Sequence, residues 1–510
     1  MVDSAAHAED SHRDGGGPRL FPFDNSYARL PERFHVKLNP TPVKQPGWLA
    51  FNANLATYLG LDAAELQTDA GLQVFAGNAV AEGSDPLAMA YAGQQFGNWN
   101  PQLGDGRAHL LGEIIAPDGL RYDIQLKGSG PTPFSRMGDG RAWIGPVIRE
   151  YIVSEAMAVL GVPTTRALAA VSTGESIFRE SVLPGGVLAR VSRGHIRVGT
   201  FQYFAARQDE EALRLLALHC LERFYPDRAQ DSAQSIDTDA FPGAALLEAV
   251  VEAQAKLIAR WMALGFIHGV MNTDNMSIAG ETIDYGPCAF LDGYDPGKVF
   301  SSIDEMGRYA YGNQPRIGHW NLVQLAQALL PLMGESEEQA VATAQEIVNR
   351  YPDISQTALR SHFAAKIGLS DGPPEIAKAQ ADQLLALMAE VKADFTNTFR
   401  ALSSSDGAFL EEMNGDPKAQ EWLAQWHSAL ANSETDVQAT RTAMRQVNPK
   451  YIPRNHRIEE AIAAGLEGDL GPFKRLSETL ASPFEDQPQN NPLAQPPKQK
   501  EEVRATFCGT

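Results

Sequence analysis

Two acidic loops that lie close together constrain this chain more than any other feature. The stretch Phe266–Asn275 is typical of the end of an apolar helix followed by a polar loop, and Asp284-Tyr-Gly begins nine residues after Asn275. Between the loops, Met276 to Ile278 is predicted to be a short strand. We expect Asp274, Asn275 and Asp284 to converge as hard oxygen ligands, the kind that Mg²⁺ takes when it is shared with substrate phosphates.

The spacing of these loops is similar to that of protein kinases, in which a His-Arg-Asp loop with a downstream Asn precedes Asp-Phe-Gly. Aligning His268 and Asn275 with that pattern puts Val270 at the position of the kinase base. A valine cannot take a proton. Asp274 is the only carboxylate of this loop, so it is the candidate general base toward an incoming hydroxyl. For His268, a structural role in ordering the loop is favoured over catalysis.

Composition excludes several classes of protein. The 510 residues are enough for two or three lobes with cores of their own, and a net charge of −20 argues against broad binding to nucleic acids or anionic membranes. No run of 18 apolar residues occurs, and residues 1–17 lack the apolar segment of a signal peptide, so we expect a cytoplasmic protein that does not span a membrane. Cys220, Cys288 and Cys508 show no metal-ligand spacing.

The strand and helix signals predict an α+β fold in five segments. Residues 1–20 are expected to be disordered, and 21–98 to form an N-terminal wrap on the segment that follows. Strand and turn signals over 99–200 predict a small sheet-containing lobe. Residues 201–480 are predicted to be a large helical lobe that carries both acidic loops, and 481–510, rich in Pro, Gln and Asn, to be a flexible tail.

Individual elements follow from periodicity and from helix-ending residues. Pro242 to Leu264 is the clearest helix, because its apolar residues follow the 3.6-residue period and Gly265 ends it. Another helix is expected from Pro146 to Leu160. Strands are expected at 109–115, 120–127, 167–172, 175–179 and 186–193, and further helices at 209–224, 319–334, 337–350, 355–366, 376–401 and 408–430.

The sheet-containing lobe holds several candidates for phosphate binding. Glycine turns let the backbone approach a phosphate closely, a strand-end lysine can pair with it, and arginines bind it in bidentate fashion. Each signal is weak alone: a plain surface turn or a solvated lysine is the more common explanation. The occurrence of all these signals, in this order and before the two acidic loops, is much less expected by chance than any one of them. The candidates are Gly104, Gly106, Arg107, Lys127, Asp139, Gly140, Arg190 and Arg197.

The carboxylate partner of Lys127 is expected on the helix that contains Pro146. Glu150 and Glu155 are both available, and they lie on opposite sides of that helix. Helical spacing does not say which side meets the sheet, so both stay open.

Several longer motifs resemble the selenoprotein O family. They are Tyr91-Ala-Gly-Gln-Gln-Phe-Gly97, the run from Lys127-Gly-Ser-Gly to Gly-Asp-Gly-Arg141-Ala, His268-Gly-Val-Met-Asn-Thr-Asp-Asn-Met-Ser277, and Asp284-Tyr-Gly-Pro. The family pattern asks for a histidine at Gln94. The similarity extends over most of the chain from about Phe21.

The resemblance implies a protein-kinase-like two-lobed fold that binds ATP in a reversed orientation, with the γ-phosphate buried and the α-phosphate presented. AMP would then be transferred to a Ser, Thr or Tyr hydroxyl of a protein substrate. It also implies that the phosphate-binding candidates above and Asp284 hold the nucleotide, that Asn275 and Asp284 bind Mg²⁺ or Mn²⁺, and that Asp274 is the base. UTP in place of ATP stays open, because no residue of these loops visibly selects adenine.

Two other functions are weighed against this one. An atypical kinase is disfavoured by Val270, and a catalytically silent nucleotide-binding scaffold is disfavoured by the intact Lys127, Asn275 and Asp284. In some family members a C-terminal cysteine pairs with a cysteine that follows the second acidic loop. Cys508 matches the first, Phe300 stands where the second is expected, and Cys288 is the nearest substitute.

Overall fold

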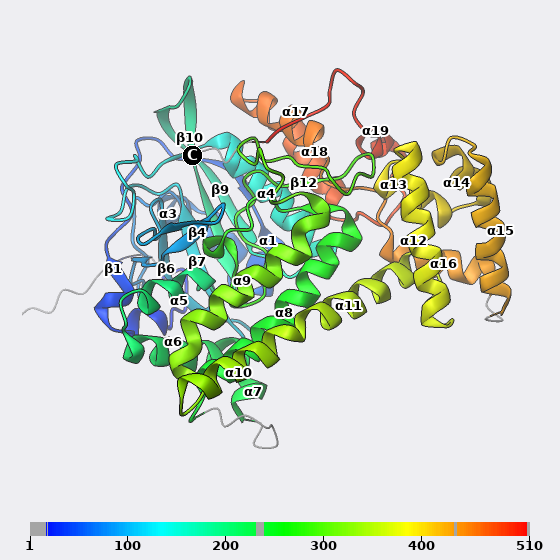
Figure 1. The fold of residues 1–510 in the computed structure, drawn as a ribbon. Coiled ribbons are helices and arrows are strands. Elements are labelled where there is room, and N and C mark those ends of the chain that lie inside the picture. The colour runs from blue at the N-terminus through cyan, green and yellow to red at the C-terminus, as the bar shows by residue number, and fades with distance from the viewer. Residues whose placement is uncertain (1–16, 18, 231–238, 433–435, 507–510) are drawn as a thin grey trace, which may run out of the picture.

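The structure, a computed structural model, describes residues 17, 19–230, 239–432 and 436–506. Most of the segment predicted to be disordered, residues 1–16 and 18, lies outside this part, as does Cys508. The fold is mixed, with one large sheet and many helices (Figure 1). Within the described part of the chain, no helix has both the length and the apolar character needed to cross a membrane.

An eight-stranded antiparallel sheet organises the first 200 residues. Its order is β1-β3-β6-β7-β10-β9-β2, with β8 paired to β10. The strands are β1 (His35–Lys37), β2 (Gly47–Phe51), β3 (Leu87–Met89), β6 (Ala108–Ile115), β7 (Arg121–Lys127), β8 (Ala142–Trp143), β9 (Arg166–Phe178) and β10 (Val182–Ser192). The segment predicted as a wrap thus supplies three strands of the same sheet. The strands predicted at 167–172 and 175–179 are one continuous strand, β9, which pairs with β10 on both sides of a register shift between Pro184 and Gly186.

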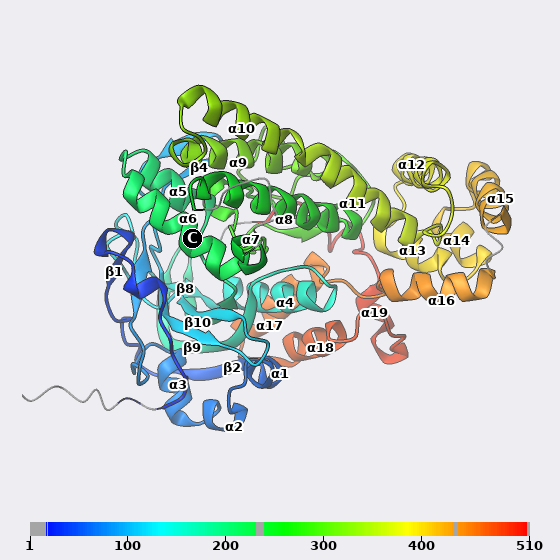
Figure 2. The same cartoon turned by 90° about the horizontal axis from the view of Figure 1, so that it is seen from below.

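Both faces of the sheet are covered, which explains why its central strands are nearly continuous runs of buried residues. Helix α4 (Ile144–Val159) packs on β9 and β10 from one side, and α1 (Ala53–Tyr58) and α3 (Asp69–Phe75) pack on the other. A short helix, α2 (Ala63–Leu66), joins α1 to α3. Viewed from below, α17 (Asn455–Leu466) and α18 (Gly471–Leu480) lie beside α4 (Figure 2).

Helix α8 (Pro242–Leu264) has the predicted bounds and forms the centre of the helical part. Gly265 ends it in the left-handed conformation, with φ of 71°, which glycine adopts without strain. Helices α6, α9, α10 and α11 pack around it. The helices before and after it are α5 (Val198–Ala205), α6 (Glu210–Phe224), α7 (Pro226–Gln230), α9 (Gln314–Leu329), α10 (Glu337–Asn349), α11 (Tyr351–Lys366), α12 (Pro374–Val391), α13 (Phe395–Leu402), α14 (Asp406–Glu412), α15 (Pro417–Asn432), α16 (Val437–Val447) and α19 (Asn491–Ala494).

Three predictions for this part are wrong in detail. The helix predicted over 376–401 breaks at Lys392, which is left-handed, and Asp394 then caps α13 by accepting from the backbone N–H of Asn397. The helix predicted over 408–430 breaks at Asn414 and Gly415, both at positive φ. Residues 276–278 form no strand, because only Ser277 makes a bridge, with Arg197.

The C-terminal segment was predicted to be a flexible tail, but residues 481–506 pack against the body of the protein. The Tyr451 hydroxyl donates to the carbonyl of Gln487 at 2.9 Å. The Thr506 hydroxyl donates to the carbonyl of Pro287 at 2.6 Å, next to the second acidic loop. The composition of this segment is typical of a flexible tail, but hydrogen bonds to residues distant in sequence hold it against the rest of the protein.

A buried lysine in α11 makes the stability of the protein depend on pH. Lys366 is 4% exposed against the rings of Phe395 and Phe399, and burial lowers its pKa to about 7. The unfolded chain, with a lysine pKa of about 10.4, therefore binds more protons than the folded protein between these two pH values, so stability rises with pH there. We expect Lys366→Met to raise the thermal midpoint at pH 6 and the gain to shrink toward pH 10.

The matched control for this change is Lys378→Met, since Lys378 is exposed and pairs with Asp382 on α12. Its midpoint should stay near that of the wild type at both pH values. A lower midpoint for Lys366→Met at pH 6 would contradict the assignment of Lys366 as a destabilising buried charge.

Candidate functional site

A cavity of about 580 Å³ brings together every residue that the sequence predicted for the site. Its lining comes from the β6–β7 hairpin, the glycine-rich loop after β7, strand β10, the start of α5 and both acidic loops. The predicted residues that line it are Gly104, Gly106, Arg107, Lys127, Asp139, Gly140, Arg190, Arg197, Asp274, Asn275 and Asp284. Residues more than 150 positions apart in the chain thus share one cavity.

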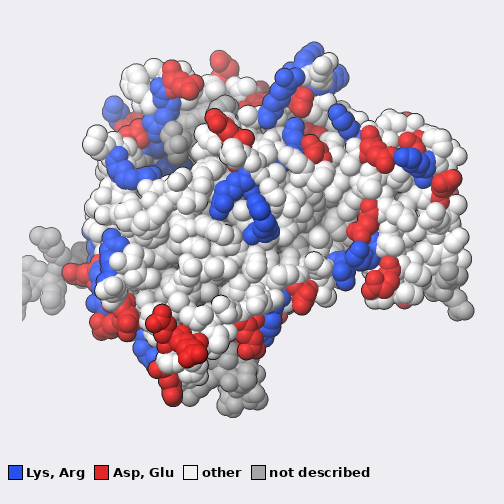
Figure 3. Space-filling model, viewed as in Figure 1, with Lys and Arg blue, Asp and Glu red and all other residues white. Residues whose placement is uncertain are grey.

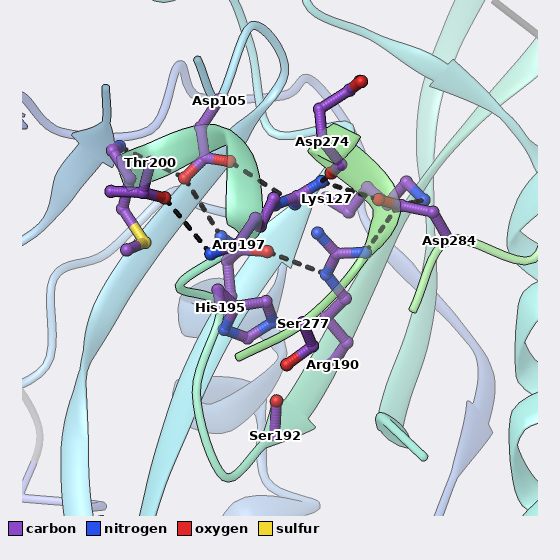
Figure 4. Close-up of polar contacts among 12 residues, drawn as sticks. Asp105, Lys127, Arg190, Ser192, His195, Arg197, Thr200, Asp274, Ser277 and Asp284 are labelled. Carbon is purple, nitrogen blue, oxygen red and sulfur yellow. Dashed lines mark hydrogen bonds and ion pairs between the residues drawn. The ribbon is translucent and has the colours of Figure 1, made fainter. Parts of the chain in front are cut away.

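Asp284 is the centre of a group of ion pairs in this cavity (Figure 4). Its Oδ1 accepts from Lys127 Nζ at 2.8 Å and from Arg190 Nη1 at 2.9 Å, and its Oδ2 accepts from Arg197 Nη1 at 2.8 Å. Burial by itself raises the pKa of Asp284, but the attraction of these three cations holds that pKa well below its usual range. Three positive groups therefore converge where one carboxylate now sits, an arrangement suited to phosphates.

The partner of Lys127 on α4 is Glu150, which settles the alternative that helical spacing left open. Lys127 Nζ lies 2.6 Å from Glu150 Oε2, and both side chains are largely buried. Glu155 faces elsewhere: it pairs with Arg166 at 2.6 Å and accepts from Asn52. The lysine–glutamate pair fixes Lys127 at the edge of the cavity.

Arg197 links the two acidic loops. Its Nη1 donates to the backbone carbonyl of Asp274 at 2.6 Å as well as to Asp284, and its guanidinium lies 4.6 Å from the centre of the Tyr91 ring. Asp105, between the two predicted glycines, is buried and accepts from the backbone N–H of Met89 at 3.1 Å. Tyr91 and Asp105 are lining residues that the sequence did not single out, although both lie inside motifs that it did.

Asp274 lies in a single 3-10 turn, Thr273–Asn275, and is 6% exposed. Its Oδ2 accepts from Gln95 Nε2 at 2.9 Å, whereas its buried Oδ1 has no hydrogen-bond partner among the described residues. Burial raises the pKa of Asp274. Its carboxylate points away from the ion pairs of Asp284 in Figure 4. A Cβ at Gly93 would lie 2.6 Å from Oδ1, so the carboxylate can take this position only because residue 93 is a glycine.

His268 orders the first acidic loop, as its sequence context predicted. Its Nε2 donates to the carbonyl of Ile283 at 2.8 Å, and its Nδ1 accepts from the backbone N–H of Val270 at 3.3 Å. The ring stacks on Trp261, and burial lowers the pKa of His268, which favours the neutral form. Val270 lines the cavity with no group that could take a proton.

The glycine-rich loop closes the cavity from the other side. Asp139 makes a bidentate pair with Arg179, at 2.8 and 3.0 Å, so its carboxylate is engaged by the protein itself. Gly140 has a positive φ, and a Cβ there would lie 2.1 Å from the carbonyl carbon of Gly130. The loop therefore offers backbone N–H groups rather than a free carboxylate. Arg179 is a further lining residue that the sequence did not identify.

The donors suit a divalent cation that is shared with phosphates. Asn275 and Asp284 both line the cavity, and Asn275 uses its amide N–H₂ to donate to the carbonyl of Val270 at 3.0 Å, which leaves its oxygen for a ligand. Within the described ranges, no three His, Cys, Asp or Glu side chains are grouped to hold a metal ion. Two protein oxygens with phosphate and water oxygens would make the six ligands that Mg²⁺ prefers.

Both cysteines that the structure describes are unavailable for easy oxidation. Cys220 and Cys288 are buried and free, and burial raises the pKa of Cys288 to about 12. The pairing of Cys288 with Cys508 lies outside the described residues.

Comparison with known proteins identifies the family of the chain. The family model described as protein adenylyltransferase SelO matches residues 20–481. A protein of Bradyrhizobium sp. strain BTAi1, named protein nucleotidyltransferase YdiU, is 55% identical over 499 residues, which is 96% of this chain and 99% of that protein. Proteins of the same name are 53% identical in Rhodopseudomonas palustris strain BisB18 (96% and 99%) and 54% identical in Rhizobium leguminosarum bv. trifolii strain WSM2304 (96% and 97%). The chain belongs to the protein adenylyltransferase SelO family.

Proposed function

We propose that this protein transfers AMP from ATP to Ser, Thr or Tyr hydroxyls of other proteins, with Asp274 as the general base. One observation carries the assignment of the base. Val270 occupies the position of a kinase base, while the same cavity holds Asp274 with a buried, unpartnered oxygen. Family membership over nearly the whole chain supports nucleotidyl transfer to protein.

The bonds made and broken follow from this assignment. The acceptor oxygen attacks the α-phosphorus of ATP and forms a new P–O bond. The bond from the α-phosphorus to the oxygen that bridges to the β-phosphorus breaks, so pyrophosphate leaves. The hydroxyl proton goes to the carboxylate of Asp274. A carboxylate whose pKa is raised by burial is a better proton acceptor than an exposed aspartate.

The binding mode of ATP is proposed from the charges in the cavity. Lys127, Arg190 and Arg197 all pair with Asp284, and Glu150 is a second carboxylate beside Lys127 and Arg190. The β- and γ-phosphates would take the place of Asp284 in these pairs. Asp284 and Asn275 would then hold Mg²⁺ or Mn²⁺, which supplies Lewis-acid stabilisation of charge on the phosphates. This places the α-phosphate toward Asp274. The Gly104–Gly106 turn, the Lys127–Glu150 pair and the second acidic loop support a kinase-like, two-lobed arrangement around the nucleotide.

The products of the reaction test the proposal. We expect one pyrophosphate for each modified protein molecule, with no ADP formed in step with the modification. ADP in stoichiometric amounts would instead show an atypical kinase, and neither product would favour a nucleotide-binding scaffold. UTP should be compared under the same conditions.

Glu150 and Glu155 give a matched pair of variants on one helix. Glu150→Gln weakens the attachment of Lys127, so we expect a drop in kcat/KM for AMP transfer of about tenfold or more, as for loss of a buried charged hydrogen bond. Glu155→Gln removes the pairing with Arg166 away from the cavity. It should lower the thermal midpoint and leave kcat/KM near the wild-type value. Equal kinetic losses in the two variants would contradict the role given to Glu150.

A further inference from the structure

Several exposed apolar side chains belong to the segments that line the cavity. Among the large apolar residues that the structure describes, the four most exposed are Met137 (102%), Met306 (92%), Phe178 (74%) and Ile303 (60%). Ile303 lines the cavity, and each of the others lies within three residues of a lining residue. The face of the molecule in Figure 3 shows acidic and basic side chains interspersed, with much uncharged surface between them. Exposed apolar groups on the segments around a site are typical of a surface that binds a partner.

Two segments meet beside the candidate base. One is the hairpin of β4 (Gly93–Gln95) and β5 (Asn98–Asn100), and the other is the loop 301–308. Asn272 Oδ1 accepts from the backbone N–H of Phe96 at 3.0 Å and from the hydroxyl of Tyr309 at 2.6 Å. Both segments are therefore fixed to the loop that carries Asp274.

The loop 301–308 is held at its base while its tip stays exposed. The buried carboxylate of Asp304 accepts from the backbone N–H groups of Arg308, at 2.9 Å, and Tyr309, at 2.7 Å. The backbone N–H of Ser302 donates to the carbonyl of Thr506 at 3.0 Å. Ile303 and Met306 are thus presented on a loop that is ordered in advance, which reduces the entropy lost when a partner binds.

Arg308 at the end of this loop has donors without acceptors. Its guanidinium lies 4.6 Å from the centre of the Trp320 ring, and a Cβ on Gly97 of the hairpin would lie 3.9 Å from its Nη1. Its Nε and Nη2 are buried and make no hydrogen bond within the described residues. The residue as a whole is half-buried, so a carboxylate of a partner could form an ion pair with the partly exposed side of its guanidinium.

We propose that Ile303, Met306 and Arg308, here called the acceptor ledge, bind an extended segment of the protein substrate. In that segment an apolar side chain contacts Ile303 and Met306, and one acidic residue reaches Arg308. Glu305 is exposed on the same loop and would repel a second acidic residue. An acidic residue is therefore favoured at one position of the substrate segment and disfavoured next to it. The inference rests on the proposed function, because the segment must bring its hydroxyl to Asp274.

Synthetic peptides with a fixed central Ser, Thr or Tyr and one varied flanking position at a time test the ledge. The intact protein is incubated with each peptide set, Mg²⁺ or Mn²⁺ and ATP labelled on the α-phosphate. The expected result is enrichment of an apolar residue at one flanking position and of Asp or Glu at another. Arg308→Gln should remove the acidic preference, a change of about three- to fivefold as for an exposed ion pair, and Arg308→Lys should retain it in part.

Met306→Ser should raise the KM of the preferred peptide by about tenfold, as for loss of a buried apolar side chain, and leave the KM of ATP unchanged. Ile376→Ser is the matched control, because Ile376 is an exposed apolar residue on α12, outside the cavity lining. Its peptide KM should equal that of the wild type. Neither Met306 nor Arg308 lines the cavity, so a change in the KM of ATP would count against the ledge.

The outcomes separate this inference from the proposed function. If Arg308→Gln labels peptides with the same flanking preferences as the wild type, and Met306→Ser has the same peptide KM, the ledge is wrong. AMP transfer would remain supported. Labelling of folded proteins in a cell lysate without labelling of any peptide would overturn binding of an extended segment. No α-label on peptides or on lysate proteins would overturn both.

Discussion

Asp274→Asn is expected to abolish AMP transfer, with kcat lower by about 10²- to 10⁴-fold, the range for loss of a general base. Asparagine has the same shape and keeps an oxygen for the bond from Gln95, but its amide cannot take the proton of the acceptor hydroxyl. ATP should bind with near-wild-type affinity, since no cation of the cavity pairs with the Asp274 side chain in the ion pairs described above. Transfer of α-label at saturating ATP, together with calorimetric titration of the nucleotide, measures the two effects separately.

Asp394→Asn is the matched control for this variant. Asp394 is also a buried aspartate, and it pairs with Arg454 away from the cavity. Its replacement should lower the thermal midpoint without changing kcat. If Asp274→Asn keeps a kcat within a few-fold of the wild type, another group takes the proton and the assignment of the base is wrong.

Asp284→Asn should give an equally large loss of transfer but a different change in nucleotide binding. The substitution removes the shared counter-charge of Lys127, Arg190 and Arg197 and one of the two proposed metal ligands. Without metal, these three cations become more available to phosphates, although Glu150 still pairs with Lys127 and Arg190. We therefore expect ATP to bind in the presence of EDTA at least as tightly as it binds the wild type, while addition of Mg²⁺ or Mn²⁺ no longer tightens binding.

Thermal midpoints report the same balance of charge. The nucleotide-free Asp284→Asn protein should be less stable than the wild type, because three largely buried cations then have Glu150 as their nearest remaining carboxylate. ATP should restore more stability to this variant than to the wild type. A variant that loses all ATP binding in EDTA would show that Asp284 positions the nucleotide by some route other than its charge.

The sequence was sufficient to predict the parts of the fold and site that depend on local signals. Pro242 and Gly265 mark the ends of α8 because proline has a φ suited to the first turn of a helix and glycine adopts the left-handed conformation without strain. The candidate site residues all line one cavity, and each lies in a loop or close to the end of a strand. The order of these loops along the chain is similar to that of protein kinases, and this order alone indicates which residues belong to one site.

What the sequence could not predict depends on contacts between distant residues. Glu150 and Glu155 lie on opposite sides of a helical wheel, and only the packing of α4 on β9 and β10 shows that the side with Glu150 faces Lys127. The 481–506 segment has the composition of a flexible tail, yet partners such as Tyr451 and Pro287 hold it in place. The acceptor ledge corresponds to no sequence motif. The exposure of Met306 depends on how the loop 301–308 packs, which the sequence does not show.

ATP labelled on either the α- or the γ-phosphate is the most direct test of the account as a whole. The wild-type protein is incubated with a cell lysate and Mg²⁺ or Mn²⁺, and label retained on protein is counted after denaturing separation. Wild-type protein should retain label on protein from the α-phosphate alone. Asp274→Asn should retain no label. Retention from the γ-phosphate alone would contradict AMP transfer and identify phosphoryl transfer.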